Sequence, residues 1–223
     1  MKQKADIFQK HVKQIIWRNS LVIAFVIFIL MLIFTSTLDK EYSFLQFSKA
    51  LAGASALMFT ASFSLSGFCY WWDFLDTKIG YRKYLGLIAY WLALAYSISI
   101  LLINPDKYLF HLTDNLFTAD VLLGGISMLI FTFIAIISRD KIMLAMGPHK
   151  WRYTLRLGYL AWILLALRAW FVEKEIWLDY LEDFSGFPPP RLLLSLLVIA
   201  VLIFRISIDI SKKCIPFTNK KIK

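Results

Sequence analysis

Cysteine and histidine are scarce in this chain of 223 residues, which holds two cysteines and three histidines. Cys69 ends an apolar run and Cys214 lies in a basic tail, so the sequence supports neither a disulfide framework nor an iron–sulfur or four-cysteine zinc site. The histidines, His11, His111 and His149, all lie outside the long apolar runs. Imidazole ligation of a metal inside a membrane-embedded core is therefore not expected.

Motifs for catalysis or nucleotide binding are missing as well. The sequence has no glycine-rich phosphate loop, no dinucleotide fingerprint and no Ser–His–Asp arrangement, and the stretch GPHKW at 147–151 lacks the spacing of such sites. A buried active site would have to be built from hydroxyls, phenols and one arginine. We therefore predict no catalytic residue, and the sequence favours a role other than catalysis.

Polar stretches long enough to form a separate soluble domain are also lacking. Hydrophobic residues make up 59% of the chain, aromatic residues make up 17%, and the mean hydropathy is +0.64. A soluble domain of this size is less apolar than this. The composition therefore predicts an integral membrane protein that is folded as one helical bundle.

Six apolar runs are long enough to cross a hydrocarbon core, which is about 30 Å thick and takes roughly 20 helical residues. The predicted spans are Leu21–Leu38, Ala50–Trp72, Tyr84–Ile103, Val121–Ser138, Leu157–Val172 and Leu192–Ile210. Charged or turn-forming segments separate them. The prediction is an all-α integral membrane protein with a six-transmembrane-helix bundle over residues 21–210.

Positive charge is distributed unevenly between the two sides of this bundle. Nineteen of the 25 lysines and arginines lie in the N-terminal segment, the second and fourth loops and the C-terminal region, which share one side of a six-span topology. Because cytoplasmic loops carry the excess of basic residues, we predict that both termini are cytoplasmic. The net charge of +10 then reflects topology, and nucleic acid is not expected as a partner.

Residues 1–20 and 211–223 flank the predicted bundle. Apolar residues recur at roughly helical spacing in the N-terminal segment, at Ile7, Phe8, Val12, Ile15 and Ile16. Such a segment either lies as an amphipathic helix on the cytoplasmic membrane surface, where its lysines meet anionic lipid, or continues the first span. Residues 211–223 are predicted to form a basic cytoplasmic tail.

Small and aromatic residues predict how the spans pack. Small side chains recur every fourth residue in the second span, at Ala52, Ala56, Thr60 and Ser64. They predict a close neighbour and a central place for this span, and Gly124-Gly125 is a weaker signal of the same kind in the fourth span. Tryptophans near the predicted interfaces are expected to be anchors, at Trp71, Trp72, Trp151, Trp170 and Trp177. A short amphipathic helix is predicted around residues 176–181 of the acidic last outer loop.

Few ionisable residues fall inside the spans, where a charge is costly. Arg168 lies in the outer half of the fifth span, and we expect it to pair with Glu173 or to extend to the interface, with a buried functional role as the alternative. Arg205 and Asp209 are four residues apart, which predicts an intrahelical pair. Asp120 is expected to be an N-terminal helix charge and not a proton carrier.

One of the predicted spans carries a recognisable pattern. The run YRKYLGLIAYWLALAYS from Tyr81 resembles the third membrane helix of the ferric-reductase-like transmembrane domain family, and within it the haem-binding membrane subunits of bacterial periplasmic methionine-sulfoxide reductase systems. Family members carry two basic residues, a variable residue, Leu-Gly-Leu, another variable residue, Ala and an aromatic residue. These are matched by Arg82, Lys83, Leu85, Gly86, Leu87, Ala89 and Tyr90.

A second stretch, IISRDKIMLAMGPHKWRYTLRLGYL, is similar to the family's linker into the fifth helix. The matching residues are Ser138, Asp140, Gly147, Lys150, Trp151, Arg156, Leu157, Tyr159 and Leu160, with about one extra residue around Pro148-His149. The resemblance covers roughly Ala50–Val172. It implies six spans, cytoplasmic termini, the bacterial inner membrane and a partner subunit in the membrane or periplasm.

The departure from the family concerns its cofactor. In that family, histidines of the second, third and fifth helices ligate b-type haem. The third-helix histidine falls on Tyr96, the two near the fifth helix fall on Leu155 and Arg168, and the second-helix position falls near Ala50. Leucine and alanine cannot ligate iron, and arginine has no free lone pair. The resemblance therefore implies the fold without the cofactor, so we predict none, with haem b, quinone or flavin as alternatives.

The function expected from this resemblance is that of a haem-free, ferric-reductase-like structural or interaction subunit of a membrane assembly. In this hypothesis Tyr96 and Arg168 fill the former haem space, and the partners are the lipid bilayer and a membrane or periplasmic protein subunit. One alternative is a membrane electron-transfer subunit with unorthodox haem, quinone or flavin binding. The other is a small transporter or lipid-binding protein that uses the former haem cavity.

Overall fold

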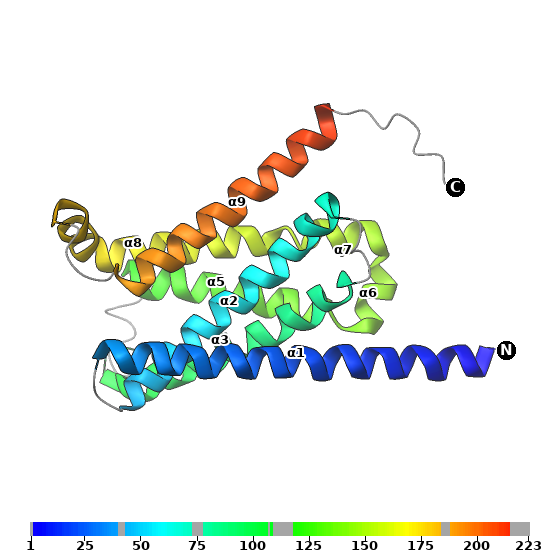
Figure 1. The fold of residues 1–223 in the computed structure, drawn as a ribbon, viewed down its shortest axis with the longest axis horizontal. Coiled ribbons are helices and arrows are strands. Elements are labelled where there is room, and N and C mark those ends of the chain that lie inside the picture. Colours follow the sequence, from blue (N-terminus) through cyan, green and yellow to red (C-terminus); the bar gives the residue numbers. More distant parts are fainter. Residues whose placement is uncertain are drawn as a thin grey trace.

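The computed structural model describes residues 2–39, 43–72, 78–106, 108, 118–183 and 188–214, and within these ranges the regular elements are all helices (Figure 1). They are α1 (Lys2–Asp39), α2 (Phe44–Trp71), α3 (Tyr81–Ile103), α5 (Ala119–Ile137), α6 (Asp140–Met146), α7 (Pro148–Thr154), α8 (Leu157–Asp183) and α9 (Pro190–Cys214). The predicted all-α fold is confirmed for this part of the chain.

Five of these helices are long and apolar enough to cross a membrane. The candidate spans are His11–Thr37, Phe44–Cys69, Tyr81–Ile103, Ala119–Ile137 and Pro190–Ile208. They correspond to the first four and the last of the six predicted spans. The predicted fifth span, Leu157–Val172, forms the first part of α8, but it carries Arg168 and is followed directly by Glu173 and Lys174. Charge, and not helix length, therefore sets α8 apart from the other five.

The outward surfaces of the candidate spans are apolar. Phe25 of α1 is 65% exposed, Leu129 of α5 is 71% exposed and Ile203 of α9 is 61% exposed. Contiguous exposed apolar surface on this scale is unfavourable in water, whereas hydrocarbon solvates it. The chain is therefore built to present these faces to lipid.

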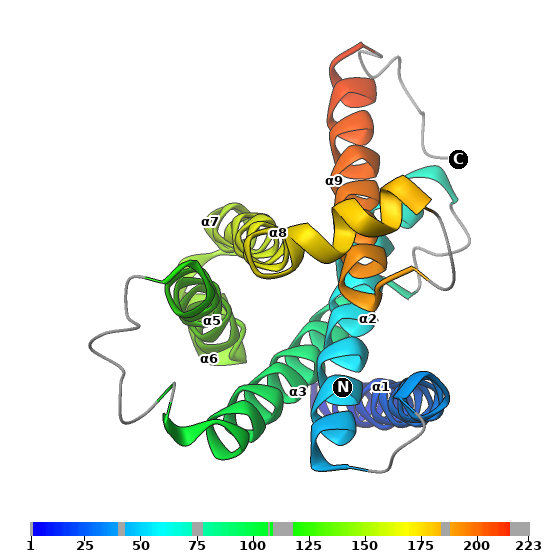
Figure 2. The ribbon, with the colours of Figure 1, turned by 90° about the vertical axis from the view of Figure 1, so that its left-hand side faces the viewer.

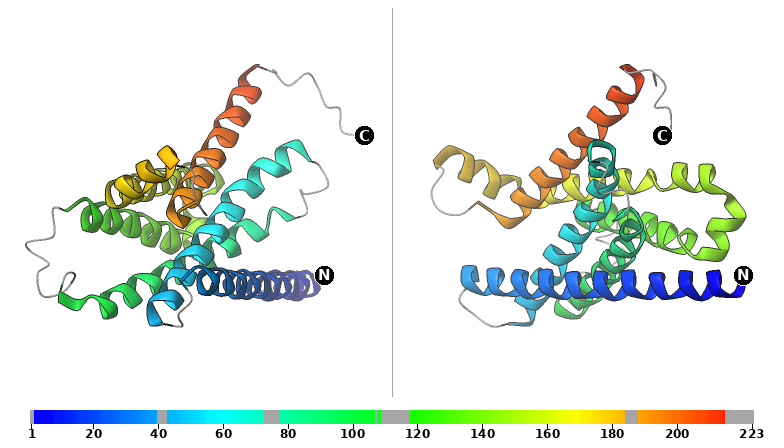
Figure 3. Two further views of the ribbon diagram at one scale, coloured as in Figure 1. Left: turned by 60° about the vertical axis from the view of Figure 1, so that its left-hand side comes forward. Right: turned by 45° about the vertical axis from the view of Figure 1, so that its right-hand side comes forward.

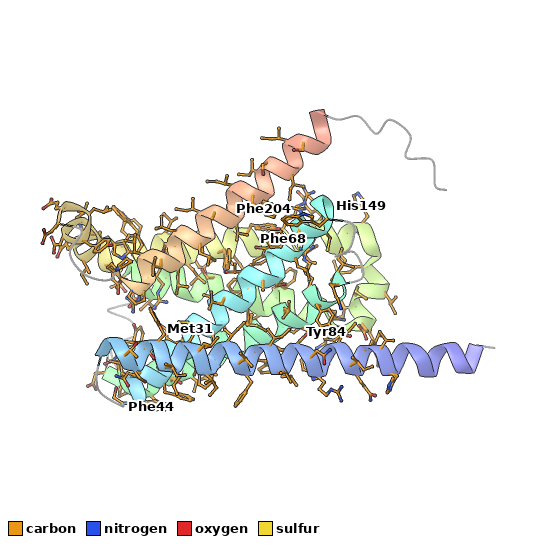
Figure 4. The ribbon with its side chains drawn as sticks, in the orientation of Figure 1. Met31, Phe44, Phe68, Tyr84, His149 and Phe204 are labelled. Carbon is orange, nitrogen blue, oxygen red and sulfur yellow. The ribbon has the colours of Figure 1, made fainter. Side chains whose placement is uncertain are left out.

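Helix α1 runs without a break through residue 20, so the N-terminal segment continues the first span as one helix. The sequence from Lys2 to Asp39 contains neither glycine nor proline, so no residue interrupts the backbone hydrogen-bond ladder. Figure 4 shows Met31 directed toward α2, where it meets Gly53, and Tyr84 of α3 beside α1. Helix α1 thus covers one side of the α2–α3 pair.

Helix α2 lies at the centre, as its small residues predict, in contact with α1, α3 and α9. It approaches α3 most closely where Ser55 Oγ donates to the Ala89 carbonyl at 2.9 Å and Ser62 Oγ donates to the Arg82 carbonyl at 2.8 Å. Gly86 lies at this crossing, because a Cβ there would approach Ser62 Oγ to 3.1 Å. The close contact is therefore made by serines and by Gly86, on a face next to the predicted stripe.

Aromatic rings of α2 connect it to the second pair of long helices, α5 and α8, which lie beside the α2–α3 pair in Figure 2. Phe59 stacks on Phe131 of α5 with centroids 4.3 Å apart, and Phe63 meets Trp162 of α8 edge-on at 5.2 Å. Trp162 is almost completely buried. These rings form the apolar core between the two pairs.

The remaining elements close the two ends of the bundle. The short helices α6 and α7 join α5 to α8 at the end where α1 begins and α9 ends (Figure 3). Gly147 separates them with φ 77°, a left-handed conformation that favours glycine. Helix α9 crosses α2, with Phe204 against Phe68 near this same end (Figure 4). We call this end of the bundle the basic end, since it carries the predicted cytoplasmic loops.

At the opposite end, α8 bends at Glu173, whose φ of −126° and ψ of 16° are not helical, and then continues to Asp183. The predicted helix around residues 176–181 is therefore present, as the continuation of α8. The expectation that Trp177 anchors at the interface is wrong. Its side chain is buried, and its ring meets that of Trp170 edge-on with centroids 5.7 Å apart.

Candidate functional site

A cavity of about 410 Å³ lies between α2, α3, α5, α8 and α9, in the half of the bundle away from the basic end. Its inner wall is apolar and aromatic, with Phe59, Phe131 and Trp162. Ala52 and Ala56 of the predicted small-residue stripe border it, so part of the stripe faces space that the described helices do not fill. The volume lies in the range of small-molecule sites, about 300–1,000 Å³.

The polar end of the cavity is a partly buried ion pair between α8 and α5. Arg168 Nε donates to Asp120 Oδ1 at 2.8 Å, and Arg168 Nη2 lies 2.7 Å from the same oxygen. Tyr108 Oη donates to the other carboxylate oxygen, Oδ2, at 2.7 Å. The Arg168 side chain is 23% exposed and that of Asp120 is 12% exposed. Asp120 also lies in the first turn of α5, where a negative charge is favourable, as predicted.

The predicted pairing of Arg168 with Glu173 is wrong. Glu173 Oε1 instead lies 2.8 Å from Arg191 Nη1 at the start of α9, and Glu173 Oε2 accepts a hydrogen bond from Trp177 Nε1 at 3.3 Å. A residue five positions along a helix does not share the face of the first, because facing pairs are three or four apart.

The two adjacent glycines of α5 shape the cavity in different ways. Gly124 lies against the guanidinium, since a Cβ there would be 3.2 Å from Arg168 Nε. Gly125 is exposed and borders the cavity, and a Cβ there would meet no atom within 4 Å. Gly124 therefore makes room for Arg168, whereas Gly125 leaves an opening toward the exposed face of α5.

The positions that the resemblance assigns to haem ligands do not all come together. Tyr96 of α3 and Arg168 both line the cavity. Leu155 lies in the turn between α7 and α8 at the basic end, with its N–H bonded to the Trp151 carbonyl at 3.1 Å. Ala50 is completely buried within α2 and is not part of the cavity wall.

Three other motif residues of the resemblance, Lys83, Trp151 and Arg156, lie at the basic end. Lys83 forms an ion pair with Asp140 at the start of α6. Arg156 stacks over the ring of Tyr153 at 5.9 Å, and Trp151 Nε1 is buried without a hydrogen-bond partner among the described residues. The side chains of Asp209, Trp71 and Cys214, and all of His111, lie outside the described residues. The predicted Arg205–Asp209 pair is therefore not described.

The donor set of the cavity does not fit a haem held as in the resembling family. The described part of its wall contains the Tyr96 phenol and the Met128 thioether, but no imidazole or thiolate. Among the described residues, no group of three His, Cys, Asp or Glu side chains is placed to hold a metal ion. The polar groups instead suit hydrogen bonding, because a guanidinium has five N–H donors and Asp120 accepts from only part of them.

Charge balance determines which ligands suit this end of the cavity. Arg168 is matched by Asp120, and Arg191, which also borders the cavity, is matched by Glu173. The described residues of the rim therefore offer donors without a net charge. Sequence reasoning missed Tyr108 and Arg191 as residues of this site. It singled out Asp120 and Arg168 because they are ionisable residues in or beside predicted spans, but it did not pair them with each other.

No protein-family model matches the chain, and no curated protein matches it. The resemblance to ferric-reductase-like domains therefore stays a prediction carried by its two motifs.

Proposed function

We propose that this protein is an integral membrane protein that binds an amphiphilic molecule, a quinone or a lipid, in the cavity between α2, α3, α5, α8 and α9. The observation that carries this proposal is the polarity of the cavity, which has an apolar aromatic wall and one charge-neutral end rich in hydrogen-bond donors. Pockets of this composition take ligands that are mostly apolar with a few polar atoms.

The cavity residues have distinct roles in this proposal. Arg168 and Tyr96 donate hydrogen bonds to the acceptor oxygens of a head group. Asp120 holds the guanidinium in place and balances its charge, so that the ion pair has no net charge. The rings of Phe59 and Phe131 contact the apolar part of the ligand. If the cavity binds a quinone, the function of the protein is electron transfer. If it binds a lipid, the function is lipid binding or transport.

The proposed topology has six spans, with both termini in the cytoplasm of a bacterial cell and the cavity in the outer half of the inner membrane. The first part of α8 is the additional span. It packs along α5, and the charge of Arg168, which is costly inside a membrane, is compensated there by Asp120. The basic residues gathered at the end where α1 begins support this orientation.

An interaction subunit of a haem-free, ferric-reductase-like assembly is the second candidate. The part of α8 after Glu173 favours it, because Ile176, Leu178 and Leu181 remain about half exposed there beside acidic residues. Isolation in mild detergent with and without Ile176→Ser and Leu181→Ser tests this candidate. A protein that co-purifies at a fixed ratio with the native chain alone supports it, and an identical set of proteins with both chains rejects it.

The binding proposal is tested by filling the cavity from Gly125. We compare the native protein, Gly125→Leu and the matched control Leu129→Phe, which enlarges an exposed side chain one turn along α5. Bound amphiphiles are extracted and identified by mass spectrometry, and a visible spectrum is recorded. One quinone or lipid class is expected in the native protein and in the control, and about tenfold less in Gly125→Leu.

Two outcomes contradict the proposal. Equal amounts of the same amphiphile in all three proteins place it on the outer surface of the bundle. A Soret band that corresponds to one haem per protein molecule contradicts the conclusion that the side chains of the cavity wall do not hold haem.

A further inference from the structure

A second, separate groove of about 410 Å³ lies at the basic end, between α3 and α5. The described residues that line it are all different from those that line the first cavity. Tyr90 and Thr132 form its base, with their side-chain oxygens 3.3 Å apart. Because α5 packs mainly on α8, its contact with α3 is slight and the groove stays open along this seam.

The rim of the groove is positively charged. Lys83 and Lys13 both bind the carboxylate of Asp140, with Lys13 Nζ 3.2 Å from Oδ2. Arg139 also lines the groove and is exposed, and no ion pair of its side chain is present in the described part of the chain. Among the described residues of this rim, three cations thus accompany one carboxylate, which leaves these residues with a net positive charge.

Below this rim the groove becomes apolar. Leu87 and Trp91 of α3 face Ala135 and Ile136 of α5 across it. Trp91 is 59% exposed and Ile136 is 45% exposed, although both lie within candidate spans. The groove therefore follows the polarity of the bilayer, with cations at the interface and apolar surface along the hydrocarbon.

We propose that this groove binds one anionic phospholipid. Its phosphate lies between Lys83 and Arg139, and an acyl chain follows Leu87, Trp91 and Ile136. Charge complementarity supports an anionic head group, because basic residues at the cytoplasmic membrane surface attract anionic lipid. The apolar wall supports a lipid over a free phosphate ion. This site is independent of the ligand proposed for the first cavity.

The test measures lipid-specific stabilisation of the full chain in detergent. Phosphatidylglycerol, phosphatidylcholine and inorganic phosphate are added separately, and the melting temperature is recorded for the native protein, Arg139→Gln and Arg156→Gln. Arg156 is a matched control, since it is an exposed arginine at the same end that does not line the groove. We expect phosphatidylglycerol to raise the native and control melting temperatures most, and this excess to fall by about half or more in Arg139→Gln.

A second variant, Trp91→Ala, tests the acyl-chain wall without changing charge, and it is expected to reduce the same excess. The proposal is overturned if phosphatidylcholine matches phosphatidylglycerol, or if Arg139→Gln behaves like Arg156→Gln. Inorganic phosphate that reproduces the effect of phosphatidylglycerol overturns the assignment to a lipid.

Discussion

The Arg168–Asp120 pair allows a quantitative test, because it joins two helices at the candidate site. Asp120→Asn keeps the shape of the side chain but removes the charge that balances the guanidinium. Removal of one partner of a buried pair typically costs about 3–5 kcal/mol. The side chains of Arg168 and Asp120 are 23% and 12% exposed, so solvent at the rim lowers this cost. We therefore expect Asp120→Asn to reduce the free energy of unfolding by about 2–3 kcal/mol.

Arg168→Leu should cost a similar amount, because it leaves the Asp120 carboxylate buried with Tyr108 as its described hydroxyl donor. The double variant contains neither charge. It should therefore be less destabilised than the sum of the two single variants, with a coupling free energy of about 2 kcal/mol. The free energy of unfolding is measured by equilibrium unfolding in one detergent for all four members of the cycle.

The Glu173–Arg191 pair is the control for this cycle. Its arginine side chain is 48% exposed and its glutamate side chain is 19% exposed, so solvent screens this pair from the arginine side. Glu173→Gln also keeps an acceptor for Trp177, and it is expected to cost less than about 1 kcal/mol. Strictly additive effects of Asp120→Asn and Arg168→Leu would refute the reasoning, since they would mean that the two charges do not depend on each other. An equal cost at Glu173 would show that burial does not set the magnitude.

Two further changes have defined outcomes. Gly158→Ala should destabilise the protein by about 1–3 kcal/mol, because the new Cβ would lie 2.7 Å from Phe63 Cζ. Phe63→Leu in the same chain should recover part of this loss, as measured by thermal unfolding. If Gly158→Ala is more stable than the native protein, the close contact between Gly158 and Phe63 is contradicted. At Asp140, the hydrogen bond from Lys83, followed by that from Lys13, holds the pKa of the carboxyl below its ordinary value. The stabilisation by the ionised Asp140 carboxylate is therefore complete above about pH 3.9 and is lost as the pH falls through the lowered pKa. The difference in melting temperature between the native protein and Asp140→Asn should therefore disappear in acid. A difference that persists in acid would argue against the ion pairs of Asp140 with Lys83 and Lys13.

The positions of the helices were predictable because lipid imposes a simple rule. An apolar run of about 20 residues satisfies its backbone polar groups in hydrocarbon only as a helix, so the run itself marks the element. The predicted span Tyr84–Ile103 and the observed Tyr81–Ile103 differ by one turn at one end. The fifth predicted span is helical for the same reason, although its charges separate it from the other five.

The sequence was ambiguous where two structures satisfy the same pattern. Residues 1–20 fit both a surface helix and an extension of the first span, since local helical periodicity is identical in the two. Small residues such as Ala52 and Ala56 were equally ambiguous, because a small side chain permits either a close neighbour or an empty space. In this protein they border the cavity, while the close contact is made by Ser62 and Gly86.

By itself, the sequence determined that the chain is helical, that it contains long lipid-compatible spans, and that its basic residues gather at one end. These properties follow from composition and periodicity along the chain. The tertiary structure alone decided that Arg168 binds Asp120, 48 residues away, and not Glu173, five residues away. The choice of an ion-pair partner depends on which helices pack together and on the direction of each side chain, and neither is encoded by sequence spacing.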